Sequence, residues 1–138
     1  MFDRREVAPD AERFLAAVGV RERVAFVGGD FFESVPPGGD VYLLRSVLHD
    51  WSDAECARIL ENCRRAISAG GVVLIVELAG GDVGSPRVAL SDLMMLVMET
   101  GRERSADEYA ALLRRAGLSL SREITVGASH LLLEAVAT

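Results

Sequence analysis

The residues best suited to chemistry lie in one short stretch, Val41 to Trp51, in which a basic residue is followed by a histidine, an acid and the only tryptophan. An imidazole titrates close to neutral pH, so His49 could act as a general base. The competing interpretation is a structural histidine, hydrogen-bonded near a helix start. Asp50 is explained equally well as a helix-start charge, and Trp51 as a packing residue. From His49 alone, the structural interpretation is the favoured one.

Three acidic residues elsewhere in the chain are the remaining candidates for a catalytic or ligand-binding role. Glu77 follows an apolar run, and Glu103 lies between two arginines. A carboxylate beyond a strand end can orient a histidine or a substrate. For Glu103, without more context, a solvated loop charge among arginines is the favoured interpretation. Asp30 follows two glycines and could accept hydrogen bonds from a ligand. It could equally be a turn residue that binds its own backbone.

Most of these candidates follow predicted strands, and ligands in open α/β sheets bind beyond the carboxyl ends of the strands. Apolar runs predict short buried strands at 24–27 and 41–44. The β-branched run at 72–76 predicts a strand covered on both faces. Two terminal strands, at about 118–126 and 131–136, should form a closing hairpin. The fold class is therefore α/β.

Helices are predicted between these strands. Apolar residues at helical spacing over 7–18 end at Gly19, a C-cap candidate. Ser52 and Ser105 each begin a capping box, opening helices that end at Gly70-Gly71 and at Gly117. A Met-rich segment over 88–98 is a further predicted helix. Strands and helices alternate in the middle of the chain, as in a parallel α/β sheet.

Composition indicates one domain without repeats: 138 residues, half of them hydrophobic, with a net charge of -6. That charge argues against a nucleic-acid surface. No apolar run approaches the ~20 residues of a membrane span, and the N-terminus lacks the apolar core of a signal peptide. Cys56 and Cys63 fall about 10 Å apart along one predicted helix, too far for a disulfide. We therefore expect a cytoplasmic protein with buried reduced thiols and no metal cluster.

Four segments, in order along the chain, resemble motifs of one enzyme family. Leu48–Asp53 is similar to L-H-D-W-x-D, the most specific of them, and Gly101–Ser105 to G-x-E-R-[ST]. Phe2–Val7 is similar to F-D-L-P-x-V, and Arg23–Phe32 to R-V-x-F-x-G-G-D-F-F. The family is the S-adenosylmethionine-dependent O-methyltransferases related to the plant caffeate and flavonoid enzymes. Bacterial members that act on polyketides and antibiotics look particularly similar, and the resemblance covers their C-terminal catalytic half.

The resemblance implies a partial Rossmann-like sheet over residues 1–138. That sheet is mostly parallel, with a C-terminal antiparallel hairpin and helices on both faces. The implied activity is transfer of a methyl group from S-adenosylmethionine, without a metal, to a hydroxyl of an aromatic or polyketide-type small molecule of secondary metabolism. His49 would be the general base, and Glu77 and Glu103 would flank its imidazole.

The resemblance also implies binding residues. Asp3 would hold the cofactor's ribose, Asp30 and Phe31 would border its adenine, and Arg45 would lie near its methionine end. The acceptor would contact Asp50 and a methionine-lined helix, although methionines at helical spacing are equally explained as core. The methionines in question are Met94, Met95 and Met98.

Parts of the family's architecture precede the region that Phe2 matches, and we expect this chain to lack them. They are the first strand, its glycine-rich cofactor loop and the helical N-terminal domain that usually makes the homodimer. Without the first strand, the edges of the strands at 24–27 and 41–44 would lie bare. Three interpretations remain: a fragment of an ordinary methyltransferase, half of a split enzyme completed by a second chain or a second copy, or an inactive interaction or structural module. We do not expect this chain alone to be active.

Overall fold

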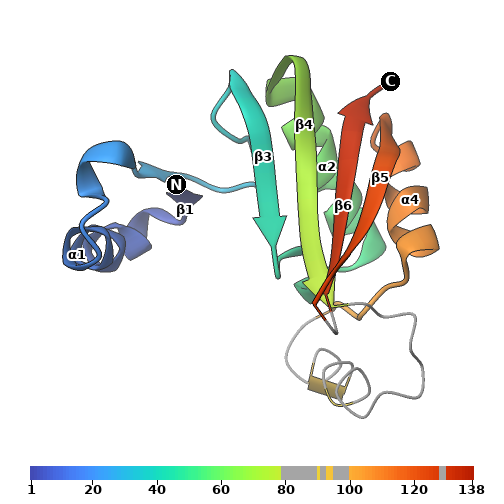
Figure 1. Ribbon diagram of the computed structural model, residues 1–138, viewed down its shortest axis with the longest axis horizontal. Coiled ribbons are helices and arrows are strands. Elements are labelled where there is room, and N and C mark those ends of the chain that lie inside the picture. Colours follow the sequence, from blue (N-terminus) through green and yellow to red (C-terminus); the bar gives the residue numbers. More distant parts are fainter. Residues whose placement is uncertain (79–89, 91–92, 95–99, 128–129) are drawn as a thin grey trace.

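The computed structural model describes residues 1–78, 90, 93–94, 100–127 and 130–138, and its strands form two separate sheets (Figure 1). In the smaller sheet, β1 (Phe2–Asp3) pairs in parallel with β2 (Val27–Gly28). The larger sheet has the order β3-β4-β6-β5. Its strands are β3 (Gly39–Arg45), β4 (Ile67–Leu78), β5 (Leu118–Val126) and β6 (His130–Ala137).

The pairing of the larger sheet confirms the predicted α/β class. β3 and β4 run parallel, while β6 runs antiparallel to both β4 and β5 and closes the predicted hairpin. Parallel strands place their carboxyl ends at one edge of a sheet. The ends of β3 and β4 therefore lie side by side, and the residues that follow them can meet.

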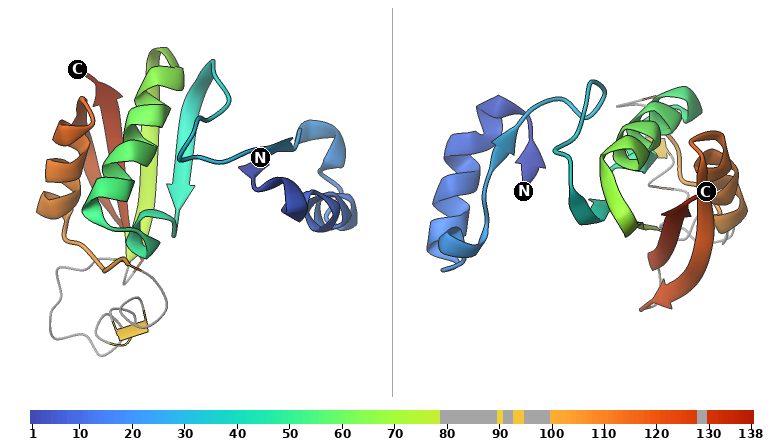
Figure 2. Two further views of the ribbon diagram at one scale, coloured as in Figure 1. Left: turned by 180° about the vertical axis from the view of Figure 1, so that it is seen from behind. Right: turned by 90° about the horizontal axis from the view of Figure 1, so that it is seen from above.

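Two helices cover one face of the larger sheet, α2 (Asp53–Ala66) and α4 (Ala106–Arg115) (Figure 2). We expected helices on both faces, but within the described part of the chain α2 and α4 lie on the same face. Beside the smaller sheet lie α1 (Ala8–Ala17) and the short 3-10 turns η1 (Arg5–Val7) and η2 (Arg21–Arg23). A third 3-10 turn, η3 (Leu48–Asp50), connects β3 to α2.

Both predicted capping boxes are present and fix the starts of the two large helices. The Ser52 hydroxyl accepts from the Glu55 amide, and the Glu55 carboxylate accepts from the Ser52 amide at 2.9 Å. The same reciprocal pair joins Ser105 and Glu108. α2 therefore begins directly after η3, so the helix start anchors the turn that carries His49.

The positions of two boundaries differ from the sequence prediction. Of the strand predicted at 24–27, only Val27 belongs to a strand, and its side chain is exposed. Among the strands that the structure describes, β2 pairs with β1 alone, which is equally short, so no second described strand extends the pairing. α2 ends at Ala66 and not at Gly70, because β4 begins at Ile67 and pairs with Gly39 of β3.

The burial of β3 and β4 also differs from expectation, for one shared reason. Val41 and Leu43 of β3 are 55% and 61% exposed, although both were predicted to be buried. In β4, Val73 and Ile75 are fully buried under the helices, whereas Val72 and Leu74 are only half-buried. Within the described residues α2 and α4 shield a single face, so alternate residues point away from the core.

The hydrophobic core lies between the larger sheet and its two helices. β3 contributes only the partly buried Tyr42 and Leu44 to it. The fully buried members of the core include Leu48, Ile59, Leu60, Val73, Ile75, Leu113, Leu118 and Leu133. Cys56 and Cys63 lie within the same cluster as free, buried thiols, which confirms that prediction. Burial raises the pKa of Cys56 to about 11 and that of Cys63 to about 12, so both stay protonated at neutral pH. In the described part of the chain, no helix is long and apolar enough to cross a membrane.

Candidate active site

His49 lies just beyond the carboxyl end of β3, where the chain turns sharply into α2. β3 ends at Arg45, and Ser46 adopts a positive φ of 50°, a conformation that residues other than glycine rarely adopt. The Ser46 amide donates to the Val76 carbonyl of β4 at 3.0 Å. Because Arg45 pairs with Val76, this turn lies beside Glu77, the next residue of β4.

Three carboxylates surround the imidazole of His49. Its Nδ1 lies 3.1 Å from Glu103 Oε1 and 4.0 Å from Glu77 Oε2, and its Nε2 lies 3.3 Å from Asp50 Oδ1. The side chains of Glu77 and Glu103 are each 1% exposed, and that of His49 is 15% exposed. The structure therefore brings together all three residues that the sequence predicted as catalytic, with Asp50 beside them.

This environment raises the pKa of His49 above its usual value of 6.5. The hydrogen bond to Glu103 contributes most, and the charges of Glu77 and Asp50 add to it, while burial of the ring acts in the opposite direction. A carboxylate accepts hydrogen bonds, so Nδ1 carries a proton toward Glu103. In the neutral ring Nε2 then holds the lone pair and is the atom that can accept a proton.

Glu77 contacts the backbone of the turn more closely than it contacts the ring. Its Oε1 accepts hydrogen bonds from the amides of Val47 and Leu48, at 3.0 and 2.9 Å. Burial raises the pKa of this carboxyl, and these amides and His49 oppose that effect. Glu103 is thus the direct partner of the imidazole, whereas Glu77 holds the turn and adds negative charge behind it.

The prediction that Glu103 orients His49 is tested by Glu103→Gln, which we expect to lower the pKa of His49. The amide keeps the side chain's shape but removes the charge that strengthens the hydrogen bond. NMR titration of the imidazole signals measures the change, and His49→Gln assigns them because the chain has two histidines. Glu61→Gln, in an exposed position on α2, is the matched control and should leave the titration unchanged. Equal midpoints for wild type and Glu103→Gln would contradict the assignment.

The raised pKa of His49 also makes the free energy of unfolding depend on pH. A raised folded-state pKa means that protonation of His49 stabilises the fold fully below 6.5, and that this contribution is lost as pH rises through the raised pKa. Glu103→Gln should flatten this dependence.

Sequence reasoning assigned no role to Arg104, which is a central residue of the site. Its guanidinium is 1% exposed and pairs with Asp53. The group also donates to the carbonyls of Leu48 and Trp51, at 2.9 and 2.7 Å. Its position in the match over Gly101–Ser105 was the available signal, because Gly101 and Glu103 of that match lie against the same turn.

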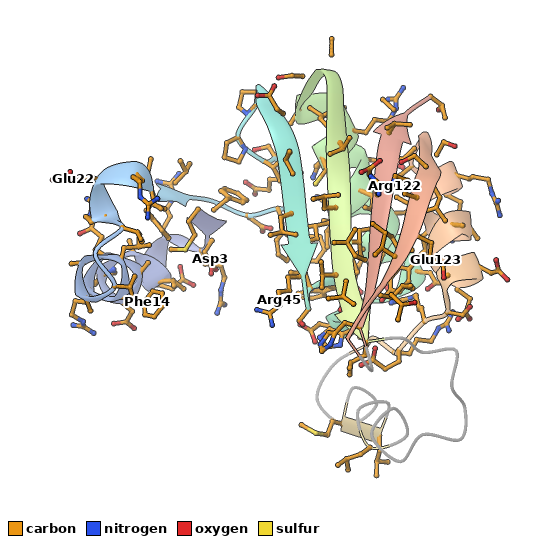
Figure 3. All side chains as sticks on the ribbon, in the orientation of Figure 1. Asp3, Phe14, Glu22, Arg45, Arg122 and Glu123 are labelled. Carbon is orange, nitrogen blue, oxygen red and sulfur yellow. The ribbon has the colours of Figure 1, made fainter. Side chains whose placement is uncertain are left out.

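The residues predicted to bind the cofactor lie at the carboxyl ends of three strands. Asp3 is exposed at the end of β1, and Arg45 is exposed at the end of β3. Figure 3 shows the two side chains on facing sides of the smaller and larger sheets. Asp30, just after β2, accepts from the Phe32 amide at 2.7 Å, which is the turn contact considered as its alternative role. No contact between Asp3 or Asp30 and the His49 cluster is found among the described residues.

Phe31 belongs to an aromatic cluster with Phe32 and Trp51. The ring centroids of Phe31 and Phe32 lie 4.8 Å apart, and those of Phe31 and Trp51 lie 5.9 Å apart, both edge to face. Asn62 of α2 donates to the Phe31 carbonyl at 2.7 Å. Trp51 packs against the core, as expected. The loop after β2 is thereby fixed both to α2, through Asn62, and to Trp51 just before that helix.

The remaining predictions concern the acceptor and metals. Met94 is described and is 49% exposed, whereas Met95 and Met98 lie outside the described residues. Among the residues that the structure describes, no group of three or more histidine, cysteine and acidic side chains could hold a metal ion.

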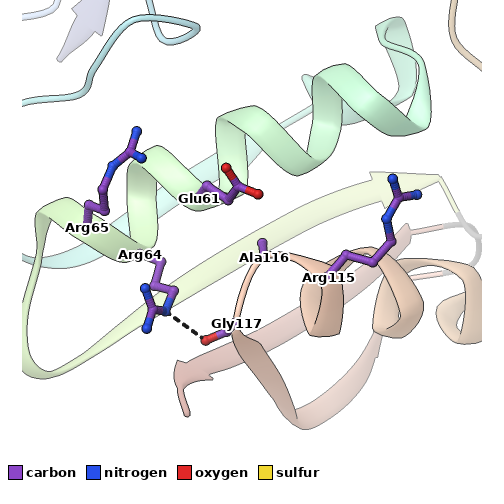
Figure 4. A pocket seen from close by; sticks show the side chains of 6 residues that line it. All are labelled: Glu61, Arg64, Arg65, Arg115, Ala116 and Gly117. Atoms are coloured by element: carbon purple, nitrogen blue, oxygen red, sulfur yellow. Dashed lines mark hydrogen bonds between the residues drawn. The ribbon is translucent and has the colours of Figure 1, made fainter.

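A surface pocket lies at the opposite end of α2 from His49, between the C-terminal ends of α2 and α4 (Figure 4). Arg64 donates to the Gly117 carbonyl at 3.1 Å, and Arg65 and Arg115 also line this pocket. Cations are favourable at helix C-termini, where carbonyl groups lack partners. These arginines therefore have a structural explanation that involves no ligand.

Comparison with known proteins gives a consistent match. Residues 1–119 match the model of the O-methyltransferase domain. The chain is 43% identical over 136 residues to a phenazine O-methyltransferase from Lysobacter antibioticus, covering 98% of this chain and 40% of that protein. It is 37% identical over 128 residues to a mitomycin biosynthesis 6-O-methyltransferase from Streptomyces lavendulae, covering 93% of this chain and 37% of that protein.

A solved structure agrees with these relatives. An O-methyltransferase from neocarzinostatin biosynthesis, in complex with S-adenosyl-L-homocysteine and 1,4-dihydroxy-2-naphthoic acid, superimposes with a TM-score of 0.89 at 34% identity. The match covers 99% of this chain and 41% of that one. The chain thus spans about 40% of the length of the proteins that it matches.

Proposed function

Because this chain belongs to the O-methyltransferase domain family, we propose that it provides the proton-accepting side of an S-adenosylmethionine-dependent methyl transfer to a hydroxyl of an aromatic small molecule. The observation that carries the proposal is the hydrogen bond of 3.1 Å between His49 Nδ1 and buried Glu103. This hydrogen bond holds a proton on Nδ1 and leaves Nε2 as the proton acceptor. Relatives that methylate phenazine and mitomycin compounds support the class of acceptor.

In the proposed reaction, the main chemical step that the protein performs is removal of the proton from the acceptor hydroxyl. A phenol with a pKa of about 10 is mostly protonated at neutral pH and is a poor nucleophile. His49 Nε2 takes the hydroxyl proton, and the oxygen becomes nucleophilic as the imidazole becomes cationic. Glu103 and Glu77 stabilise that cation. Asp50 is partly exposed beside Nε2, so we place the acceptor on this side of the ring.

The residues at the strand ends fit the chemical groups of S-adenosylmethionine. The carboxylates of Asp3 and Asp30 suit ribose hydroxyls and the adenine amine, Phe31 offers an aromatic edge, and Arg45 suits the carboxylate of the methionine end. When bound, this cofactor supplies an electrophilic methyl group on a sulfonium. The role of the protein is then to hold the two partners and to move the proton.

The arrangement of the two sheets supports a further part of the proposal, that another strand completes the cofactor site. In the described structure β3 pairs only with β4, and β1 pairs only with β2. Val41 and Leu43 of β3 are exposed. A strand from a second chain, from a second copy or from a longer form of this protein would pair with these edges and join the sheets. The same exposed strand favours a second candidate function, an interaction module without catalysis.

Calorimetry with S-adenosylmethionine, combined with the mass in solution, tests this proposal. We expect the isolated chain to bind S-adenosylmethionine weakly or not at all. Binding should appear once a segment carrying the strand that joins the two sheets is supplied. Asp3→Ala should then weaken the binding of the cofactor. Micromolar binding by the monomer would contradict the need for a completing strand. No binding in either preparation, with folded protein in both, would contradict methyl transfer and favour the interaction module.

A further inference from the structure

We propose that Arg104 is a positioning residue for His49, because it holds the turn that carries the imidazole in the one arrangement that reaches Glu103. The inference rests on His49 being the base proposed above. Its test observes the imidazole directly, so either statement can fail while the other stands.

The hydrogen bonds of Arg104 reach both ends of the turn that carries His49. A guanidinium has five N–H donors, and this one makes five hydrogen bonds. One donor goes to the Leu48 carbonyl and another to the Trp51 carbonyl, at 2.9 and 2.7 Å. These two carbonyls lie on either side of His49 and Asp50. The guanidinium thus spans the turn from one end to the other.

Asp53 fixes the guanidinium in that position. Its Oδ1 accepts from Nε at 3.0 Å and from Nη2 at 2.8 Å. Asp53 is the first residue of α2. Arg104 therefore links the carbonyls of the His49 turn to the helix start that follows it. Its own side chain is 1% exposed, whereas that of Asp53 is 46% exposed.

Glu77 binds the amide side of the same turn, and Arg104 binds its carbonyl side. Glu77 Oε1 accepts from the amides of Val47 and Leu48. Two buried, oppositely charged side chains thus satisfy backbone groups at opposite sides of one short turn. Backbone polar groups buried without partners are costly, so the turn depends on both.

The segment that supplies Arg104 also supplies the partner of the imidazole. Glu103 precedes Arg104 and binds the ring at 3.1 Å. Gly101 packs against the same turn so closely that a Cβ there would collide with backbone atoms of His49, Asp50 and Trp51. The position of the ring relative to Glu103 is therefore set by the contact between the His49 turn and the segment from Gly101 to Arg104. The hydrogen bonds of Arg104 join these two segments, and we call them the clamp.

Arg104→Lys separates this positioning role from the role of charge. Lysine keeps the positive charge but has three donors on a single atom, which cannot span both carbonyls and Asp53. Loss of the clamp should loosen the hydrogen bond between His49 and Glu103, and the pKa of His49 should fall toward 6.5. If Arg104 acts only through its charge, or only by stabilising the fold, the pKa will stay unchanged in the folded variant.

The measurement is NMR titration of the His49 imidazole in the full chain, with His49→Gln for assignment and circular dichroism to establish folding. Arg102→Lys is the matched control, since Arg102 binds Glu108 at 2.6 Å and lies 3.8 Å from Asp53 without contacting the turn. A fall in the pKa of His49 in Arg104→Lys that exceeds any change in Arg102→Lys supports the proposal. An equal or higher pKa overturns it.

A second measurement on the wild-type chain keeps the proposal testable if Arg104→Lys does not fold. Five hydrogen bonds should stop rotation of the guanidinium, so NMR should resolve separate, slowly exchanging Nη–H signals for Arg104. Arg23, exposed in η2, provides the reference for a rotating group. Averaged, rapidly exchanging Arg104 signals would show that the clamp is not formed and would overturn the inference.

Discussion

We expect His49→Gln to lower the turnover of methyl transfer by about 10²- to 10⁴-fold, the usual contribution of a positioned general base. Glutamine approximates the size of the imidazole, and its amide can still donate to Glu103 Oε1. It has no atom that accepts a proton at neutral pH, so the acceptor hydroxyl would have to react in its protonated form. The measurement is the initial rate at saturating cofactor and acceptor, in a preparation where the chain is active.

Cofactor affinity is the control for this variant. His49 lies in the turn after β3, while the side chains proposed to hold the ribose and adenine belong to the segments that follow β1 and β2. The dissociation constant for S-adenosylmethionine should therefore be unchanged. Full turnover in His49→Gln would remove His49 from its role. Loss of cofactor binding together with turnover would indicate a structural role for this histidine.

We expect Leu60→Ala to lower the free energy of unfolding by about 2–5 kcal/mol, the range for truncation of a buried leucine. Leu60 lies on α2, is fully buried and belongs to the core between the sheet and its helices. Its removal would leave a cavity that rigid neighbours on β4 and α4 can fill only in part. Urea denaturation of the isolated chain, followed by circular dichroism, measures the loss.

Leu43→Ala is the matched control for that change. The substitution is the same, but Leu43 lies on the face of β3 that α2 and α4 leave open, and it is 61% exposed. We expect a change within about 0.5 kcal/mol, as for most surface positions. Losses of similar size in the two variants would mean that the far face of β3 is also packed, which would contradict the placement of the core.

The elements that the sequence predicted correctly are those that depend on local chemistry. The capping boxes at Ser52 and Ser105 need only residues three positions apart, and Gly19 and Gly117 adopt the positive φ that a helix C-cap requires. The prediction that Val41 and Leu43 are buried was wrong, because the exposure of a strand's side chains depends on what covers each face of the sheet. An apolar run does not contain that information.

The site was predictable as a set of residues but not as a geometry. Glu103 is 54 positions from His49 in the sequence, and without the resemblance it was better explained as a loop charge. The resemblance grouped Glu103 with His49, and the structure gave the distance between them. Arg104 was missed because a buried arginine that binds carbonyls has the same sequence signature as a solvated one.

The pH profile of turnover tests the central claim most directly, namely that His49 is the base. A base must be unprotonated to act, so the rate for the wild type should be low in acid and rise through the raised pKa of His49. The midpoint should lie above 6.5 and should follow the imidazole titration seen by NMR. The rise should be absent from His49→Gln. A wild-type rate that stays constant while His49 titrates, or the same rise in His49→Gln, would contradict the claim.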